Sequence, residues 1–407
     1  MSTVGVIAEY DPFHTGHAWH LAETRRLLGA DTAVVCVMSG NWTQRGTCAL
    51  TDKWTRASLA LSGGADLVLE LPTVWAVSSA ESFARGAAGL LEAASVVDVL
   101  SFGSECGDAD KLRRLAACLD SPACQAELSR FPDRGMPFAA CRQAVVRGIL
   151  GDEDAALLDG ANNNLGVEYL KAAGRLNWDC RIVTVPRRGA GHDSAEEGEY
   201  LSGSALRQRM LAREWDAVGA AVPREAAELY RPAFDMGRAP VTMAGAERLI
   251  LARLRTMTEE EFAALPDCGE GLHRRLYKAA QNARSVEELL SLVKTKRYAH
   301  ARLRRIVMCA WLGIDAAASA ELPEYLHVLG CNERGRAVLA RLRDAAALPV
   351  LIKPADVREL SPAAQTQFER EVRTTELYSL AYPALDQAVP GTEWRTGPVV
   401  LTAPEKP

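Results

Sequence analysis

The first 190 residues alternate short apolar runs with single amphipathic helical patterns, and this alternation constrains the fold more than any other feature. Residues 2–10, 31–40, 66–72, 96–105 and 180–186 are typical of buried strands. Helical patterns cover residues 16–30, 51–65, 79–94 and 162–176. Parallel strands need crossover connections, and a helix between two strands supplies one. The sequence therefore predicts an α/β fold with a Rossmann-like parallel sheet and helices on both faces.

The pattern changes after this part of the chain. From about residue 215 to 315 amphipathic helices dominate, and near residue 325 strand and helix patterns alternate again. We therefore expect a first domain over residues 1–215 and a mainly helical region with a small α/β element over 216–390. The Pro- and Thr-rich residues 391–407 are expected to form a loose tail.

Composition excludes several classes of protein. The formal net charge is −5, so a nucleic-acid partner would need a local basic patch. The ten cysteines include no CxxC pair and several lie in apolar runs, which favours buried free thiols over a zinc site or a disulfide framework. There is no signal-peptide pattern and no apolar run near the ~18 residues of a membrane span. We expect a cytoplasmic protein with no dedicated metal site.

The segment EYDPFHTGH directly follows the first predicted strand. Ligands bind at the carboxyl ends of parallel strands, and a helix N-terminus favours a phosphate group. His14 and His17 are three residues apart at the start of the next helix, so both imidazoles can face one space, and Gly16 permits close backbone approach. One interpretation is a packed loop that contains imidazoles. The alternative, a phosphate site, is favoured because the HxGH pattern stands between a strand and a helix.

The HxGH pattern resembles the HxGH nucleotidyltransferase superfamily, whose members bind ATP and attack its α-phosphorus. A second signature of that superfamily is similar to LSGSALR at residues 201–207. In this segment Ser202 and Ser204 can cap a helix and offer hydroxyl groups to phosphate, and Arg207 can pair with phosphate oxygens. An ordinary helix N-cap would explain this segment alone.

More of the chain resembles one family in that superfamily, the bacterial tRNA(Met) cytidine acetate ligases. The resemblance rests on EYDPFHTGH, VMSGNWTQRG, DKWTRA, GADLVLELP, SFGSE, NNNLGVEYLKA, RRGAGHD and SGSALR. It implies that acetate attacks the α-phosphate of ATP to give acetyl-adenylate and pyrophosphate. The acetyl group would then pass to N4 of the wobble cytidine of elongator tRNA(Met). ATP is thus the implied substrate, with Mg²⁺ expected beside it and no acetyl-CoA.

The resemblance also implies site residues, with His14 and His17 as the catalytic pair. The implied ATP-binding residues are Ile7, Ala8, Glu9, Tyr10, Asp11, Pro12, Phe13, His14, Thr15, Gly16, His17, Ala18, Trp19, His20, Gly103, Asn162, Arg187, Ser204 and Arg207. Arg188 remains an alternative to Arg187 because the two are adjacent. The chain departs from the family pattern at three positions, where it has Asp11 for Asn, Ala161 for Pro and Asn164 for Ile.

Other polar residues have two interpretations each. Asn41, Gln44 and Arg45 follow the second strand and either contact substrate or form a surface loop. Lys53 and Arg56 share a helix face and either hold phosphate or are solvated.

The segment KTKRYAHARLRR, residues 294–305, is the strongest local basic cluster. With the resemblance it favours contact with tRNA over a solvated helix. The expected tRNA-binding residues are Lys294, Lys296, Arg297 and Tyr298, with Tyr298 stacking or forming hydrogen bonds.

Two other functions remain open from the sequence. A small-molecule adenylyltransferase acting on a phosphorylated cofactor precursor would use the HTGH and SGSALR segments but not the helical C-terminal half. A non-catalytic RNA-binding or scaffold protein would have only a relic of a nucleotide pocket, and the retained His14, Gly16, His17 and Arg207 argue against it. The oligomeric state is left open.

Overall fold

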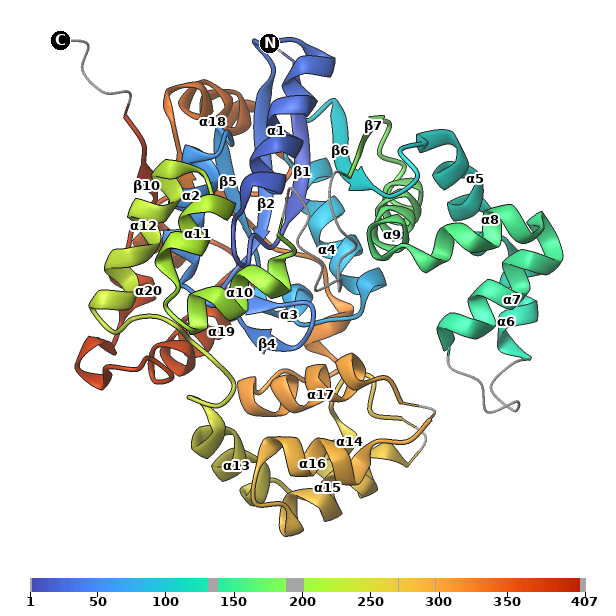
Figure 1. Ribbon diagram of the computed structural model, residues 1–407, viewed down its shortest axis with the longest axis vertical. Helices are drawn as coiled ribbons and strands as arrows, with labels where there is room; N and C mark the ends of the chain where they lie inside the picture. Colours follow the sequence, from blue (N-terminus) through green and yellow to red (C-terminus); the bar gives the residue numbers. More distant parts are fainter. Residues whose placement is uncertain (1, 131–137, 188–200, 270, 297, 403–407) are drawn as a thin grey trace.

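The computed structural model describes residues 2–130, 138–187, 201–269, 271–296 and 298–402. Its centre is an eight-stranded sheet in the order β10-β8-β5-β2-β1-β6-β7, with β9 paired to β8 (Figure 1). The strands of this sheet are β1 (Thr3–Ala8), β2 (Ala33–Ser39), β5 (Leu67–Leu71), β6 (Val99–Ser104), β7 (Arg181–Pro186), β8 (Leu326–Cys331), β9 (Val350–Leu351) and β10 (Val399–Val400). Strands β5, β2, β1, β6 and β7 are mutually parallel, which confirms the predicted α/β fold.

The order of these strands creates a switch point beside β1. From β1 the chain moves to β2 and then β5 on one side, and it later returns to place β6 and β7 on the other side. Crossovers leave β1 and β6 in opposite directions, so the ends of these two strands are free of covering connections. A crevice outside their carboxyl ends is the place where open α/β sheets bind ligands.

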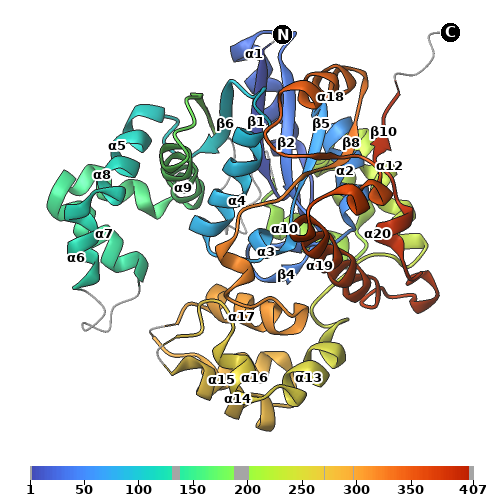
Figure 2. The same cartoon turned by 180° about the vertical axis from the view of Figure 1, so that it is seen from behind.

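Helices cover both faces of the sheet. Figure 1 shows α1, α2, α11 and α12 on one face, and Figure 2 shows α4 and α18 on the other. The β1 side chains alternate accordingly, with Val4 and Val6 in one apolar cluster and Ile7 in the other. The helices of the first 235 residues are α1 (Thr15–Leu28), α2 (Lys53–Ser62), α3 (Thr73–Ala76), α4 (Ala80–Ala93), α5 (Ala109–Asp120), α6 (Pro122–Ser129), α7 (Phe138–Leu150), α8 (Asp152–Ala156), α9 (Ala161–Arg175), α10 (Gly203–Leu211), α11 (Trp215–Ala221) and α12 (Arg224–Asp235).

The helices predicted from about residue 215 onward divide in the structure: α11 and α12 pack on the face of the sheet with α2, and the others form a separate group below the carboxyl edge of the sheet in Figure 1. This group consists of α13 (Glu247–Thr256), α14 (Glu259–Ala263), α15 (Leu272–Asn282), α16 (Val286–Val293) and α17 (His300–Leu312). A hairpin of β3 (Trp42–Thr43) and β4 (Thr47–Cys48) lies between this group and the sheet. The strand, helix and strand expected after residue 325 are β8, α18 (Glu333–Ala345) and β9. Strand β8 extends the main sheet antiparallel to β5.

The C-terminal segment is anchored as far as Leu401, where a loose tail was expected from residue 391. After α19 (Pro362–Ser379), helix α20 (Thr392–Arg395) places Glu393 in the core, and β10 pairs with β8. Lys53 Nζ lies 2.7 Å from Glu393 Oε1 and 2.7 Å from Glu70 Oε1, and all three side chains are buried. His327 Nδ1 lies 2.7 Å from Glu70 Oε2. Glu70, His327 and Glu393 are close enough to hold a metal ion, but the Lys53 ammonium supplies the positive charge among them.

Two further features bear on the expectations from composition. None of the ten cysteines forms a disulfide in the structure, and most of them are buried. Among the described residues, no helix combines the length and the apolar composition that a membrane crossing requires.

Candidate active site

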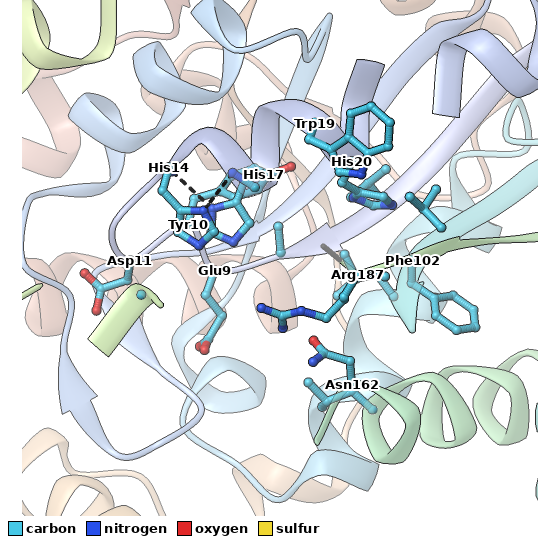
Figure 3. Close-up of a pocket in the computed structure, with 18 of the residues that line it drawn as sticks. Glu9, Tyr10, Asp11, His14, His17, Trp19, His20, Phe102, Asn162 and Arg187 are labelled. Atoms are coloured by element: carbon cyan, nitrogen blue, oxygen red, sulfur yellow. Dashed lines mark hydrogen bonds between the residues drawn. The ribbon is translucent and has the colours of Figure 1, made fainter. Parts of the chain in front are cut away.

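An open pocket of about 250 Å³ lies at the carboxyl ends of β1, β6 and β7 (Figure 3). The predicted residues that line it are Ile7, Ala8, Glu9, Tyr10, Asp11, Pro12, His14, Gly16, His17, Trp19, His20, Gly103, Asn162 and Arg187. They come from segments up to 180 residues apart in sequence, which the sheet order brings to one edge. The structure therefore brings most of the predicted ATP-binding residues together.

The two predicted catalytic histidines are stacked at the N-terminus of α1. Their ring centroids are 3.8 Å apart with an interplanar angle of 24°. His14 is the N-cap, and its Nδ1 accepts a hydrogen bond of 3.0 Å from Gly16 N. His17 Nδ1 accepts one of 3.3 Å from His14 N. Because both Nδ1 atoms accept hydrogen bonds, the neutral rings carry their protons on Nε2, which makes Nε2 the donor atom of each ring.

A second helix N-terminus lies beside this pair. Ser202 is the N-cap of α10, and its Oγ accepts a hydrogen bond of 3.2 Å from Ala205 N. Ser202 and Gly203 line the pocket, and a Cβ atom at Gly203 would lie 4.0 Å from His14 Nε2. Two helix N-termini thus contribute partial positive charge to one space, which suits a phosphate group.

Two residues of the SGSALR segment lie elsewhere than expected. Ser204 is exposed and is not part of the pocket wall. Arg207 also lies outside the wall: its Nη1 is 2.5 Å from Asp11 Oδ2, and its Nη2 donates to Cys48 O at 3.1 Å. The guanidinium group therefore connects α10 to the loop after β1 and to the β3–β4 hairpin.

The opposite wall of the pocket comes from β6, β7 and α9. A Cβ atom at Gly103 would lie 3.7 Å from Arg187 Cγ, so the glycine lies directly beside the arginine. His20 Nε2 is 3.1 Å from Ser101 Oγ, and burial, reinforced by the charge of Arg187, lowers the pKa of His20 to about 4. His20 is therefore neutral at physiological pH. Arg188 lies outside the described residues, so of the two adjacent arginines only Arg187 is placed.

Asn162, at the start of α9, is oriented by the carboxylate of Glu105, which directly follows β6. Glu105 Oε1 accepts hydrogen bonds from Asn162 Nδ2 at 2.6 Å and from Asn162 N at 3.0 Å. Beside it, buried Asn163 ties α9 to β6, because its Oδ1 accepts a hydrogen bond of 2.7 Å from Ser104 Oγ. Asn164, one of the departures from the family pattern, donates to Gly160 O at 2.9 Å and so holds the turn before the helix.

Sequence reasoning missed the apolar part of the wall. The additional lining residues are Val6, Phe83, Phe102, Leu165, Tyr169, Val185 and Pro186, whereas Leu201, Ser202 and Gly203 belong to the LSGSALR segment that the sequence analysis had singled out. Phe102, Val185 and Pro186 are at the carboxyl ends of predicted strands, so sheet order was the signal that could have found them. Such a flat apolar wall suits a purine base.

Three residues predicted within the ATP segment do not line the pocket. Phe13 is fully buried, and its backbone N–H donates to Tyr230 Oη at 2.6 Å. Thr15 and Ala18 are on α1 but outside the wall. Phe13, Thr15 and Ala18 thus belong to the same segment as the two histidines without facing the pocket.

The sequence left two interpretations for several polar residues after the second strand and on the next helix, and the structure shows the contacts of these side chains. Arg56 is fully buried and donates to the carbonyl oxygens of Glu9, Ser39 and Gly40. Lys53 lies in the buried cluster with Glu70 and Glu393, so neither Lys53 nor Arg56 holds phosphate.

Asn41 is buried beside α2 and accepts a hydrogen bond from Lys53 N. Gln44 lines the pocket, and its backbone N–H donates to Glu9 Oε1 at 2.7 Å.

The β3–β4 hairpin meets α17 (Figure 1), and Arg45 of the hairpin lies near Arg304 of this helix. A Cβ atom at Gly46 would lie 2.6 Å from Arg305 N, so hairpin and helix are in direct backbone contact. Burial, with the adjacent charge of Arg45, lowers the pKa of Arg304. The Nε atoms of Arg304 and Arg305 have no hydrogen-bond partner among the described residues. We call Arg45, Arg304 and Arg305 the arginine seam.

The expected tRNA-binding residues that are described differ in their exposure to solvent. Lys294 and Lys296 are exposed, and Lys294 Nζ donates to Tyr298 O. Tyr298 is only 5% exposed and belongs to the apolar core, with the Arg302 guanidinium 5.4 Å from its ring centroid. The expected base-stacking role of Tyr298 is therefore excluded by burial. Arg297 lies outside the described residues.

Comparison with known proteins places this site in a family. Residues 1–390 match the family described as HIGH Nucleotidyl Transferase. The tRNA(Met) cytidine acetate ligase of Caldanaerobacter subterraneus subsp. tengcongensis is 37% identical over 388 residues, which cover 94% of this chain and 96% of the relative. That of Acetivibrio thermocellus is 32% identical and covers 98% of this chain and 100% of the relative.

Solved structures agree with these relatives. The apo crystal structure of Thermotoga maritima TmcAL is 30% identical, with a TM-score of 0.94 over 99% of this chain and 100% of that chain. The same protein bound with α-thio-ATP gives a TM-score of 0.91 with the same coverage. This chain therefore belongs to the HIGH nucleotidyl transferase family and, within it, to the tRNA(Met) cytidine acetate ligases.

Proposed function

We propose that the protein is an ATP-dependent ligase that activates acetate as acetyl-adenylate and transfers the acetyl group to N4 of the wobble cytidine of elongator tRNA(Met). The observation that carries the proposal is the stacked pair of His14 and His17 at a helix N-terminus inside the pocket of a chain from this family. The relatives named for this activity, and the neighbour that binds an ATP analogue, support ATP as the substrate.

The pocket suggests how ATP would be held. The apolar wall of Phe102 and Val185 would receive the adenine, and Asn162 would form hydrogen bonds with its edge or with the ribose. The α-phosphate would lie at the N-termini of α1 and α10. Arg187 would neutralise phosphate charge. Mg²⁺ would bind together with the triphosphate, because the pocket lining offers no cage of carboxylates. The Asp11 carboxylate already pairs with Arg207 and accepts a hydrogen bond from Leu50 N.

In the first half-reaction an acetate oxygen would attack the α-phosphorus, and the bond from that phosphorus to the pyrophosphate oxygen would break. Negative charge then grows on the oxygens around phosphorus. The Nε2–H groups of His14 and His17 would donate hydrogen bonds to these oxygens, so the histidines stabilise the displacement without forming a covalent intermediate.

In the second half-reaction the cytidine must reach the same pocket. The arginine seam adjoins the hairpin that carries Gln44 of the pocket wall, and the Nε atoms of Arg304 and Arg305 have no hydrogen-bond partner among the described residues. Phosphate groups of the anticodon loop would bind there, with Lys294 and Lys296 extending the positive surface. An unstacked wobble base could then enter the pocket.

Exchange of labelled pyrophosphate into ATP tests the proposal. Exchange should depend on acetate, and addition of elongator tRNA(Met) should yield N4-acetylcytidine at the wobble position, measured by mass spectrometry of digested tRNA. Initiator tRNA(Met) is the matched control substrate. Exchange that requires a phosphorylated cofactor precursor in place of acetate would indicate an adenylyltransferase. Absence of exchange from saturated enzyme would indicate a non-catalytic protein.

A further inference from the structure

Glu9 lines the pocket and is hydrogen-bonded to the hairpin that carries Arg45 of the arginine seam. It directly follows β1, and its side chain lines the pocket. In Figure 3 it extends from the end of β1 away from the imidazole pair, toward the side of the pocket where Arg187 and Asn162 also extend. The carboxylate therefore faces the interior of the pocket, on the side away from the imidazoles.

Glu9 is held by one hydrogen bond at its carboxylate and by another at its backbone carbonyl oxygen. Glu9 Oε1 accepts a hydrogen bond of 2.7 Å from Gln44 N, and the Glu9 carbonyl oxygen accepts one of 2.6 Å from the buried Arg56 Nη1. Gln44 precedes Arg45, and the next residue, Gly46, contacts the backbone of α17. A short rigid segment thus connects Glu9 to the surface proposed for tRNA.

The acceptor chemistry calls for a base at this place. The lone pair of the cytosine N4 amine is delocalised into the ring, so the amine is a weak nucleophile and must lose a proton as it attacks. We propose that Glu9 is the general base of the acetyl-transfer step, a proposal that rests on the proposed function. The bond from N4 to the acetyl carbon forms, the bond from that carbon to the phosphate oxygen breaks, and AMP leaves with the electron pair. The amine proton goes to the Glu9 carboxylate.

The electrostatic surroundings of Glu9 agree with this role. Burial raises the pKa of Glu9 to about 7, with a hydrogen bond from Gln44 opposing it. Of the charged neighbours, Asp11 raises the pKa further, whereas Arg56 on α2 and Arg45 on the hairpin lower it. Tyr169 of α9 faces the same carboxylate. A base with a pKa near the working pH is suited to accept a proton and release it again.

The test separates the two half-reactions in Glu9→Gln. Glutamine keeps the length of the side chain and can still accept the hydrogen bond from Gln44 N, but it cannot take a proton. We expect single-turnover transfer of labelled acetate to tRNA to slow by about 10²–10⁴-fold, far more than any change in acetate-dependent pyrophosphate exchange. The wild-type transfer rate should rise with pH through about 7 and then level off, and this rise should be absent in Glu9→Gln.

Glu23→Gln is the matched control, because Glu23 is on α1 outside the pocket and pairs with Arg26. It should leave both half-reactions unchanged. Transfer at the wild-type rate in Glu9→Gln would overturn the proposal. Parallel loss of exchange and transfer would also overturn it, because Glu9 would then serve ATP binding or folding. Failure of the proposed function is distinguishable, since wild-type enzyme would then show no acetate-dependent exchange.

Discussion

Arg207 and Asp11 form an ion pair across 196 positions of sequence, with Arg207 Nη1 2.5 Å from Asp11 Oδ2. The pair joins the first turns of α10 to the loop between β1 and the catalytic histidines. Asp11 also accepts a hydrogen bond of 2.7 Å from Leu50 N, so one carboxylate connects three segments. Arg207 of the LSGSALR segment thus holds the loop that leads into the HxGH segment.

Replacing Arg207 should therefore cost stability as well as activity. Arg207→Ala leaves the Asp11 carboxylate, 8% exposed, without its cation, and should lower the free energy of unfolding by about 1–3 kcal/mol. Urea denaturation measures this. Adding Asp11→Asn should recover part of the loss, because the unpaired charge is removed. Arg209→Ala, on the same helix but 43% exposed, is the control. Unchanged stability of Arg207→Ala would argue against the pair.

Removing one imidazole should slow activation of acetate. His17→Ala deletes a donor whose orientation is fixed by the hydrogen bond from His14 N and by stacking on His14. Exchange of labelled pyrophosphate should fall by about 10²–10³-fold, the effect of losing one donor to developing charge. His273→Ala on α15, remote from the pocket, should exchange normally. Normal exchange by a folded His17→Ala protein would contradict the proposed role.

The buried cluster around Lys53 should make stability depend on pH through Glu371. Burial, reinforced by the charge of Glu70, raises the pKa of Glu371 from 4.5 to about 8. The folded protein then binds more protons than the unfolded chain between these values, so the contribution of Glu371 to stability falls as pH rises from about 4.5 to 8.

Glu371→Gln imitates the protonated acid and should remove this dependence. Its free energy of unfolding, relative to wild type, should increase from pH 5 to pH 8. Glutamine can retain contacts with Thr73, whose N and Oγ1 lie 2.9 Å and 2.6 Å from the two carboxylate oxygens. Parallel pH profiles of the two proteins would show that Glu371 is ionised in the fold.

The C-terminal anchor should be essential for stability. Glu393→Ala takes one carboxylate from the fully buried Lys53 and also removes the acceptor of a hydrogen bond of 2.8 Å from Thr375 Oγ1. Breaking such a buried pair should lower the free energy of unfolding by about 3–5 kcal/mol in urea denaturation. Asp386→Ala, an exposed acid in the same segment, should have little effect. Equal stability of the two variants would mean that Glu70 alone balances Lys53.

Weakened tRNA binding is the expected result of Arg304→Gln. If Arg304 contacts one phosphate group, the slope of log binding constant against log salt should decrease by about one. Filter binding at several salt concentrations measures the slope, and acetate-dependent exchange should be unaffected. Arg274→Gln, 73% exposed on α15 and paired with Glu259, is the matched control. Equal slopes for the two variants would place the tRNA elsewhere.

The local pattern of the sequence was enough to predict the parallel sheet and the histidine pair. Buried strands such as β2 are continuous apolar runs, and the HxGH segment stands directly between a strand and a helix. These features depend on neighbours in the chain, so periodicity and turn chemistry reveal them. Sequence pattern also identified Gly103, Asn162 and Arg187 through the family resemblance, and the fold brings all three to the pocket.

Charged side chains whose partners are distant in sequence could not be assigned in the same way. Lys53, Arg56 and Arg207 resemble phosphate ligands in the sequence, yet each is held by acceptors inside the fold. The place of Glu9 between pocket and arginine seam likewise depends on the hairpin that packs against α17. Periodicity fixes which residues face inward, whereas the partner of a buried charge is fixed only when strands and helices from remote parts of the chain pack together.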